Sequence, residues 1–140
     1  MKSENDIEDK MHAHGNTEGQ VVLQASLDGV DYPIVIGAGL DGIADRIASF
    51  THSKRISILS DSFFKGGYCS QLENDLKEKE FEVITFFMEG GKANKSIYTA
   101  LSVLDNLESN EFTRDSTLIA VGGGIVGDVG GFAAATFLRG

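Results

Sequence analysis

Short apolar runs alternate along this chain with stretches of helical periodicity, and the last run ends in three glycines. The runs ISILSD (56–61), FEVITFF (81–87) and TLIAVGGG (117–124) are too short for buried helices and are typical of buried strands. Strands that alternate with helices in this way form right-handed βαβ crossovers. We therefore predict an α/β domain with a parallel sheet and helices on both faces. The helical positions that support this prediction are Tyr68, Leu72 and Leu76, then Ile97, Ala100, Leu101, Leu104 and Leu107.

The residues before this alternating region predict a hairpin and a short helix. VVLQASL (21–27) and YPIVIG (32–37) are two candidate strands that can pair around Asp28-Gly29. Apolar residues then recur at helical spacing over residues 40–47, and we expect Asp41 to cap that helix.

Composition and net charge exclude several classes of protein. Residues 1–20 lack hydrophobic periodicity and are rich in charge, which predicts a disordered acidic tail before one domain over residues 21–140. The formal net charge of −9 argues against affinity for nucleic acid or an anionic membrane. The single cysteine, Cys69, cannot form an internal disulfide, and no apolar run approaches the length of a membrane span. These features predict a cytoplasmic protein.

Two glycine loops fit the pattern G-x-G-x-x-G that binds dinucleotide phosphates. The first is GAGLDG (Gly37, Gly39 and Gly42), where an ordinary turn is the favoured interpretation because glycine turns after strands are common. Asp61 is a separate candidate. It ends a central strand, where ligands bind in open, Rossmann-like sheets and an acidic residue can accept ribose hydroxyls.

The second loop, GGGIVGD (122–128), lies between a predicted strand and a predicted helix. Without side chains, its backbone can approach a pyrophosphate and the helix amides can donate to the phosphate oxygens. A Walker A loop is excluded, because Asp128 stands where that motif requires a lysine. The Asp128 carboxylate suits sugar hydroxyls, and the alternative is a simple cap on the first turn of the helix.

The helix after this loop, VGGFAAATFLRG (129–140), consists almost entirely of small and apolar residues. This composition predicts a buried helix that packs closely against the sheet or a second domain. Arg139 at its end is a candidate phosphate clamp, and an ordinary surface arginine is the alternative.

The run GGGIVGDVGGFAAATFLRG (122–140) resembles the signature of the 3-dehydroquinate synthase family of sugar phosphate cyclases, and YPIVIGAGL (32–40) resembles the start of that family's first domain. The resemblance extends over nearly all of residues 21–140, which correspond to the N-terminal third or so of a family member. It implies an N-terminal NAD-binding domain without the C-terminal, metal-binding helical domain. We expect such a fragment to be inactive alone.

The resemblance also implies site residues. Carried over by motif, Gly123, Gly124 and Asp128 would contact the nicotinamide and pyrophosphate of NAD, and Asp61 its adenosine side. Arg139 corresponds to an arginine that grips the substrate phosphate. This sequence departs from the family pattern at Asp61-Ser62-Phe63, where the family usually has Asp-x-Asn.

A third cofactor motif of the family, Gly-Glu-x-x-Lys-Ser, is only partly kept. The segment here is GKANKS (91–96), in which Lys95 matches and Lys92 replaces the glutamate. An ammonium cannot accept hydrogen bonds from ribose hydroxyls. Either NAD is bound differently or weakly, or the pocket accepts a phosphorylated ribose.

The implied parent enzyme is a carbon–oxygen lyase of the shikimate pathway, and hence of aromatic amino acid biosynthesis. NAD oxidises a ring hydroxyl of 3-deoxy-arabino-heptulosonate 7-phosphate, phosphate leaves by β-elimination, the hydride returns, and an aldol step closes the carbocycle. A divalent metal, zinc or cobalt, polarises the oxidised oxygen from a site of one Glu and two His outside this chain. His12, His14 and His52 lack ligand spacing, so we expect no metal ligand here. The parent is expected to be a homodimer with a small sugar phosphate as substrate.

Three alternatives stay open. GGKANK (90–95) is more similar to the valiolone-synthase branch, which cyclises sedoheptulose 7-phosphate, although the longer match after GGG favours dehydroquinate synthase. Lys92 supports a nucleotide-binding module without catalysis. A dehydrogenase of the iron-dependent alcohol type is disfavoured by the helix that follows GGG.

Overall fold

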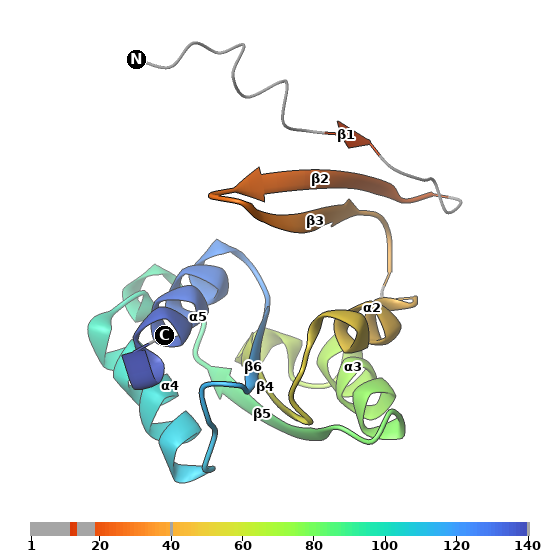
Figure 1. Ribbon diagram of the computed structural model, residues 1–140. Helices are drawn as coiled ribbons and strands as arrows, with labels where there is room; N and C mark the ends of the chain where they lie inside the picture. Colours follow the sequence, from red (N-terminus) through yellow and green to blue (C-terminus); the bar gives the residue numbers. More distant parts are fainter. Residues whose placement is uncertain (1–11, 14–18, 40, 140) are drawn as a thin grey trace. The chain divides into compact units, whose positions relative to one another are not determined.

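The computed structural model describes residues 12–13, 19–39 and 41–139, and it divides into two compact units, Met1–Gly39 and Leu40–Gly140 (Figure 1). The predicted acidic tail lies largely outside the described residues. Two residues of that tail, His12–Ala13, form a short strand, β1, that pairs with β2. In the described part of the chain, no helix is long and apolar enough to cross a membrane.

The first unit contains the predicted hairpin. Strands β2 (Val21–Leu27) and β3 (Val30–Ile36) pair antiparallel, with Leu27 opposite Val30. The two residues between them, Asp28 and Gly29, have φ values of 52° and 83°. Two consecutive left-handed residues match the twist of the flanking strands, and Asp-Gly is a favoured pair for this turn. The hairpin prediction is confirmed.

The second unit contains the predicted parallel sheet. Its strands are β4 (Arg55–Asp61), β5 (Glu82–Met88) and β6 (Thr117–Val121), in the order β5-β4-β6. Both pairings are parallel. The connecting helices are α3 (Gly67–Glu78) and α4 (Ile97–Ser109), while α2 (Ile43–Phe50) precedes the sheet and α5 (Gly124–Thr136) follows it. Short 3₁₀ turns are η1 (Ser62–Phe64), η2 (Lys92–Asn94) and η3 (Phe137–Arg139).

Helices cover both faces of this sheet, as the sequence predicts. Figure 1 shows α4 and α5 on one side and α2 and α3 on the other. Alternate residues of β4 enter separate cores, with Leu59 packed among α4 and α5 and Ile56 and Ile58 packed with α2 and α3. All three side chains have no exposed surface. The α/β, Rossmann-like prediction is therefore confirmed for this unit.

Helix α5 approaches the sheet very closely because it carries glycine at the contact. A Cβ at Gly130 would lie 3.2 Å from Leu59 Cδ2 and 3.3 Å from the Cβ of Ala120. The close packing predicted for this small-residue helix is thus present. Only one face is buried, however, and Gly131 and Phe132 on the other face are exposed.

Two local predictions are wrong. Asp41 does not cap α2; that helix begins after Gly42, whose φ is 73°, and no side chain caps it. In α3 the inward positions are Cys69, Leu72 and Leu76, whereas Tyr68 is exposed. The spacing i, i+3, i+7 defines one face of a helix as well as the i, i+4, i+8 spacing that the sequence suggested, so a small thiol could replace the tyrosine.

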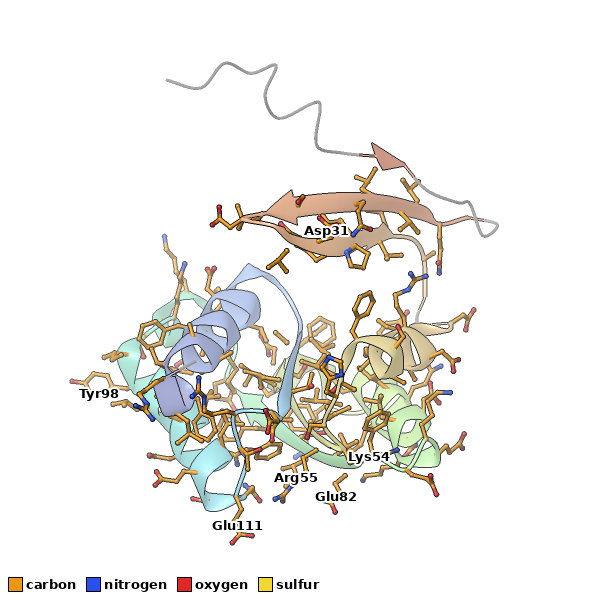
Figure 2. All side chains as sticks on the ribbon, in the orientation of Figure 1. Asp31, Lys54, Arg55, Glu82, Tyr98 and Glu111 are labelled. Atoms are coloured by element: carbon orange, nitrogen blue, oxygen red, sulfur yellow. The ribbon has the colours of Figure 1, made fainter. Side chains whose placement is uncertain are left out.

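The amino end of the sheet is joined to the end of α4 by Arg55. Its two terminal nitrogens donate to the carbonyls of Asn110 (2.9 Å) and Glu111 (3.0 Å), and its Nε lies 3.2 Å from Glu82 Oε2. The guanidinium also lies over the ring of Phe112. Figure 2 shows Arg55, Glu82 and Glu111 together at this end of the unit.

Candidate functional site at the carboxyl edge of the sheet

Three loops leave the sheet at one edge, because parallel strands all end on the same side. Asp61 of β4 pairs with Met88 of β5, and Ser60 pairs with Val121 of β6. The loops after these residues therefore begin side by side. This edge is where ligands bind in open α/β sheets.

Asp61 is held by its own loop and by the loop after β5. Its Oδ1 accepts a hydrogen bond from the backbone N–H of Phe63 at 2.9 Å, which caps η1. Gly90 packs directly against the same carboxylate: a Cβ at position 90 would lie 2.8 Å from Oδ1 and closer still to Oδ2. The half-buried carboxylate thus has a fixed orientation at the edge where the sequence places it.

Two polar side chains, Asn94 and Ser96, order the loop after β5. Asn94 Nδ2 donates to the carbonyl oxygen of Gly90 at 2.7 Å, which closes the turn that contains η2. Ser96 then caps α4, its Oγ accepting from the N–H of Thr99 at 3.3 Å. Lys95 lies between these two fixed points.

Lys95 and Asp128 form an ion pair between this loop and α5. Lys95 Nζ lies 2.6 Å from Asp128 Oδ2, and both side chains are more than half exposed. The pair borders a groove of about 310 Å³ between α4 and α5. The other lining residues are mostly apolar: Ser96, Ile97, Ala100, Val129 and Phe132. Two of the predicted site residues thus share one groove.

The glycine loop after β6 contains two kinds of glycine. Gly122 is required by packing, because a Cβ there would lie 2.7 Å from Cγ2 of the buried Val126. At Gly123, Gly124 and Gly127, a Cβ would meet no atom of the described chain within 4 Å, and φ is not positive. Neither backbone conformation nor internal packing therefore explains these three glycines.

The first turn of α5 has no side-chain cap. Gly123 is the N-cap residue and makes no side-chain hydrogen bond, and Asp128 lies beyond the first turn. The simple-cap alternative for Asp128 is therefore wrong. Among the described residues, no side chain therefore accepts from the leading amides of α5, which lie at the positive end of the helix.

The first glycine loop has a different explanation. Gly39 and Gly42 have φ values of 77° and 73°, a region that favours glycine, so the turn itself requires them. This supports the ordinary-turn interpretation. Leu40, between them, lies outside the described residues.

Two other candidates from the sequence, Arg139 and Lys92, do not line the groove. Arg139 is in η3, beyond the C-terminal end of α5. Since α5 has 13 residues, this end lies about 20 Å from Gly124 at a rise of about 1.5 Å per residue. Lys92 is exposed in η2. Within the described ranges, no group of three or more His, Cys, Asp and Glu side chains could hold a metal ion.

Several residues that line the groove could not be identified from the sequence. Ile97, Ala100 and Phe132 look like ordinary core positions in the sequence, and only the packing of α4 against α5 shows that they line a groove. Ser96 carried a usable signal, because a serine before an apolar periodic stretch predicts an N-cap.

Comparison with known proteins gives consistent results. Residues 85–140 match the family described as 3-dehydroquinate synthase N-terminal. The 3-dehydroquinate synthase of Streptococcus thermophilus is 33% identical over 119 residues, which cover 84% of this chain and 34% of that protein. The enzyme of Prochlorococcus marinus is 38% identical over 112 residues, or 78% of this chain and 31% of that protein. The chain thus spans about a third of the length of these relatives.

A solved structure shows the same fold. It is that of 2-deoxy-scyllo-inosose synthase complexed with carbaglucose-6-phosphate, NAD⁺ and Co²⁺, with a TM-score of 0.73 and 20% sequence identity. The similarity covers 85% of this chain and 33% of that one. The sequence match places residues 85–140 in the 3-dehydroquinate synthase N-terminal family, and the solved structure shows that this chain shares its fold with 2-deoxy-scyllo-inosose synthase.

Proposed function

We propose that this chain binds NAD at the carboxyl edge of the parallel sheet, as the cofactor-binding part of a 3-dehydroquinate-synthase-like enzyme. The observation that carries the proposal is the set of three glycines, Gly123, Gly124 and Gly127, that the fold itself does not require. Missing side chains at the start of an uncapped helix leave space and amide donors for a pyrophosphate. The related inosose synthase structure contains NAD⁺, which supports this choice of ligand.

Each of these residues would contact a different part of NAD. Gly123 and Gly124 would let the backbone approach the pyrophosphate, and Asp61 would accept hydrogen bonds on the adenosine side. Lys95 and Asp128 would act together, with the ammonium near phosphate oxygens and the carboxylate toward sugar hydroxyls. The apolar lining of the groove suits a planar ring. Bound NAD would supply a hydride acceptor.

The activity of the parent enzyme follows as a proposal from the family. We infer cyclisation of 3-deoxy-arabino-heptulosonate 7-phosphate with loss of phosphate, with zinc or cobalt held by residues that the described chain does not offer. Arg139, an exposed residue at the far end of α5, would contact the substrate phosphate in the full-length enzyme. Sedoheptulose 7-phosphate is the second substrate candidate, on the strength of residues 90–95.

One observation favours a second function. Lys92 is exposed where the family has a carboxylate that accepts ribose hydroxyls. A nucleotide-binding module without catalysis would tolerate the loss of this carboxylate. An adenine nucleotide with a phosphorylated ribose would bind better, because its phosphate can pair with the Lys92 ammonium.

Calorimetric titration of the 140-residue chain with NAD, NADP and ADP tests the proposal. We expect saturable one-site binding of a dinucleotide. In parallel, phosphate release from the heptulosonate phosphate should stay at the level of a metal-free blank, with or without NAD and zinc. Failure of every nucleotide to bind would reject the binding function, and phosphate release above the blank would reject the inactivity of this chain.

A further inference from the structure

We propose that Ser60 is a positioning residue for the phosphate-binding glycine loop, acting through the carbonyl of Val121. This inference rests on the proposed dinucleotide site and adds a residue that never touches the cofactor. Ser60 has no exposed surface and lies one residue before Asp61. Ser60 is therefore next to Asp61 in the chain and opposite Val121, the residue before the second glycine loop.

The Ser60 hydroxyl joins three elements. It donates to the carbonyl oxygen of Val121, the last residue of β6, at 2.8 Å. It accepts from the thiol of Cys69 in α3 at 3.1 Å, and the carbonyl of its neighbour Asp61 is more distant at 3.5 Å. Because a hydroxyl has one proton, the shorter bond to Val121 takes it, and the thiol supplies the second bond.

This bond fixes the point at which the glycine loop begins. Gly122 follows Val121 directly and is pressed against Val126 of α5. The loop is therefore anchored at Val121 by the Ser60 hydroxyl and at Gly122 by the buried side chain of Val126. Beyond these anchors, Gly123 and Gly124 have no side chain to hold them. The position of the Val121 carbonyl thus depends on a hydrogen bond from one side chain, the Ser60 hydroxyl.

Strand β4 contains a natural control. Ser57 is 1% exposed and lies on the same strand, but no hydrogen bond joins its hydroxyl to the end of β6 among the described residues. Ser57→Ala and Ser60→Ala thus remove the same group from similarly buried positions. Only the second change releases the glycine loop.

The test compares both variants in two measurements. The first is NAD affinity by calorimetry, and the second is the ¹⁵N order parameter of the Gly123 and Gly124 amides in the ligand-free chain. We expect Ser60→Ala to weaken NAD binding about fivefold, the effect of one ordinary hydrogen bond. We expect the two order parameters to fall from rigid values of about 0.85 toward about 0.6. Ser57→Ala should change neither quantity.

The outcomes separate the two proposals. If the unaltered chain binds no dinucleotide, the proposed function fails, and the order parameters alone decide whether Ser60 positions the loop. Equal loop mobility in the two variants overturns the inference, as does weaker binding without a more mobile loop. If Ser60→Ala does not fold, Ser60→Cys, kept reduced because residue 60 lies beside Cys69, replaces the hydroxyl with a larger and weaker donor and must loosen the loop in the same direction.

Discussion

Lys95 and Asp128 face each other across the groove between α4 and α5, with 2.6 Å between Nζ and Oδ2. Lys95 precedes α4, and Asp128 lies in α5 just beyond its first turn. In the ligand-free chain each group is the other's partner. A bound dinucleotide can share both, because a carboxylate has further acceptor sites and an ammonium has further donors.

The first prediction is that this ion pair serves binding and not stability. The double change Lys95→Met with Asp128→Asn should alter the free energy of unfolding by less than about 1 kcal/mol, because both groups are exposed to solvent. NAD affinity should fall. Urea denaturation and calorimetry measure the two effects. The Glu73–Lys77 pair of α3 is the control, since its removal should leave NAD affinity unchanged. A loss of stability above about 2 kcal/mol would show instead that the Lys95–Asp128 pair is structural.

The second prediction concerns the contact between Gly90 and Asp61. Gly90→Ala should push the Asp61 carboxylate from its position, since a Cβ would lie 2.8 Å from Oδ1. We expect affinity for ADP, which contains the adenosine and the pyrophosphate of NAD without the nicotinamide riboside, to fall severalfold. Gly131→Ala is the control, because a Cβ there meets nothing within 4 Å and alanine favours the helix. Unchanged ADP binding in Gly90→Ala would remove Asp61 from the adenosine side.

The third prediction addresses Lys92. If residue 92 faces the adenosine ribose, Lys92→Glu restores two hydrogen-bond acceptors and should raise NAD affinity about tenfold, or about 1.4 kcal/mol. The same change should weaken NADP, because the new carboxylate repels the 2′-phosphate. Both nucleotides are titrated against both proteins. An unchanged NAD/NADP affinity ratio would place Lys92 outside the pocket.

The fourth prediction concerns the opposite end of the sheet. Arg55→Lys should lower the free energy of unfolding by about 1–2 kcal/mol, because one ammonium cannot reach both carbonyls that the guanidinium bridges. Arg46→Lys on α2 is the matched control, since the Arg46 side chain makes no contact of this kind with the described residues. NAD affinity should stay the same in both variants. Equal stability of the two variants would contradict the role of Arg55 in joining β4 to α4.

Periodicity predicted the strands and helices because buried faces follow the repeat of each element. It was less accurate about which face is buried. Two positive-φ glycines, Gly66 and Gly67, set the start of α3, and Cys69 occupies the inward position that Tyr68 was expected to fill. Likewise Val103 lies in the core, whereas Leu101 is exposed. A stripe of apolar residues wider than the buried face leaves such choices to tertiary packing.

The candidate site was predicted as separate motifs and not as an arrangement. The strand ends place Asp61 and the second glycine loop at one edge, and this follows from topology alone. The meeting of Lys95 with Asp128 depends on the turn that Asn94 closes onto Gly90, which no periodicity encodes. Ser60 was not predicted either, because a buried serine in a strand carries no signal until its partner on β6 is known.

The central claim is that the second glycine loop, and not the first, holds the dinucleotide. Asp128→Ala and Asp41→Ala test it directly, because each removes one carboxylate beside one of the two loops. Calorimetric titration with NAD should show affinity reduced about tenfold for Asp128→Ala, the loss of a charge-assisted hydrogen bond, and unchanged for Asp41→Ala. Equal losses, or a larger loss for Asp41→Ala, would contradict the account and assign the cofactor to the GAGLDG loop.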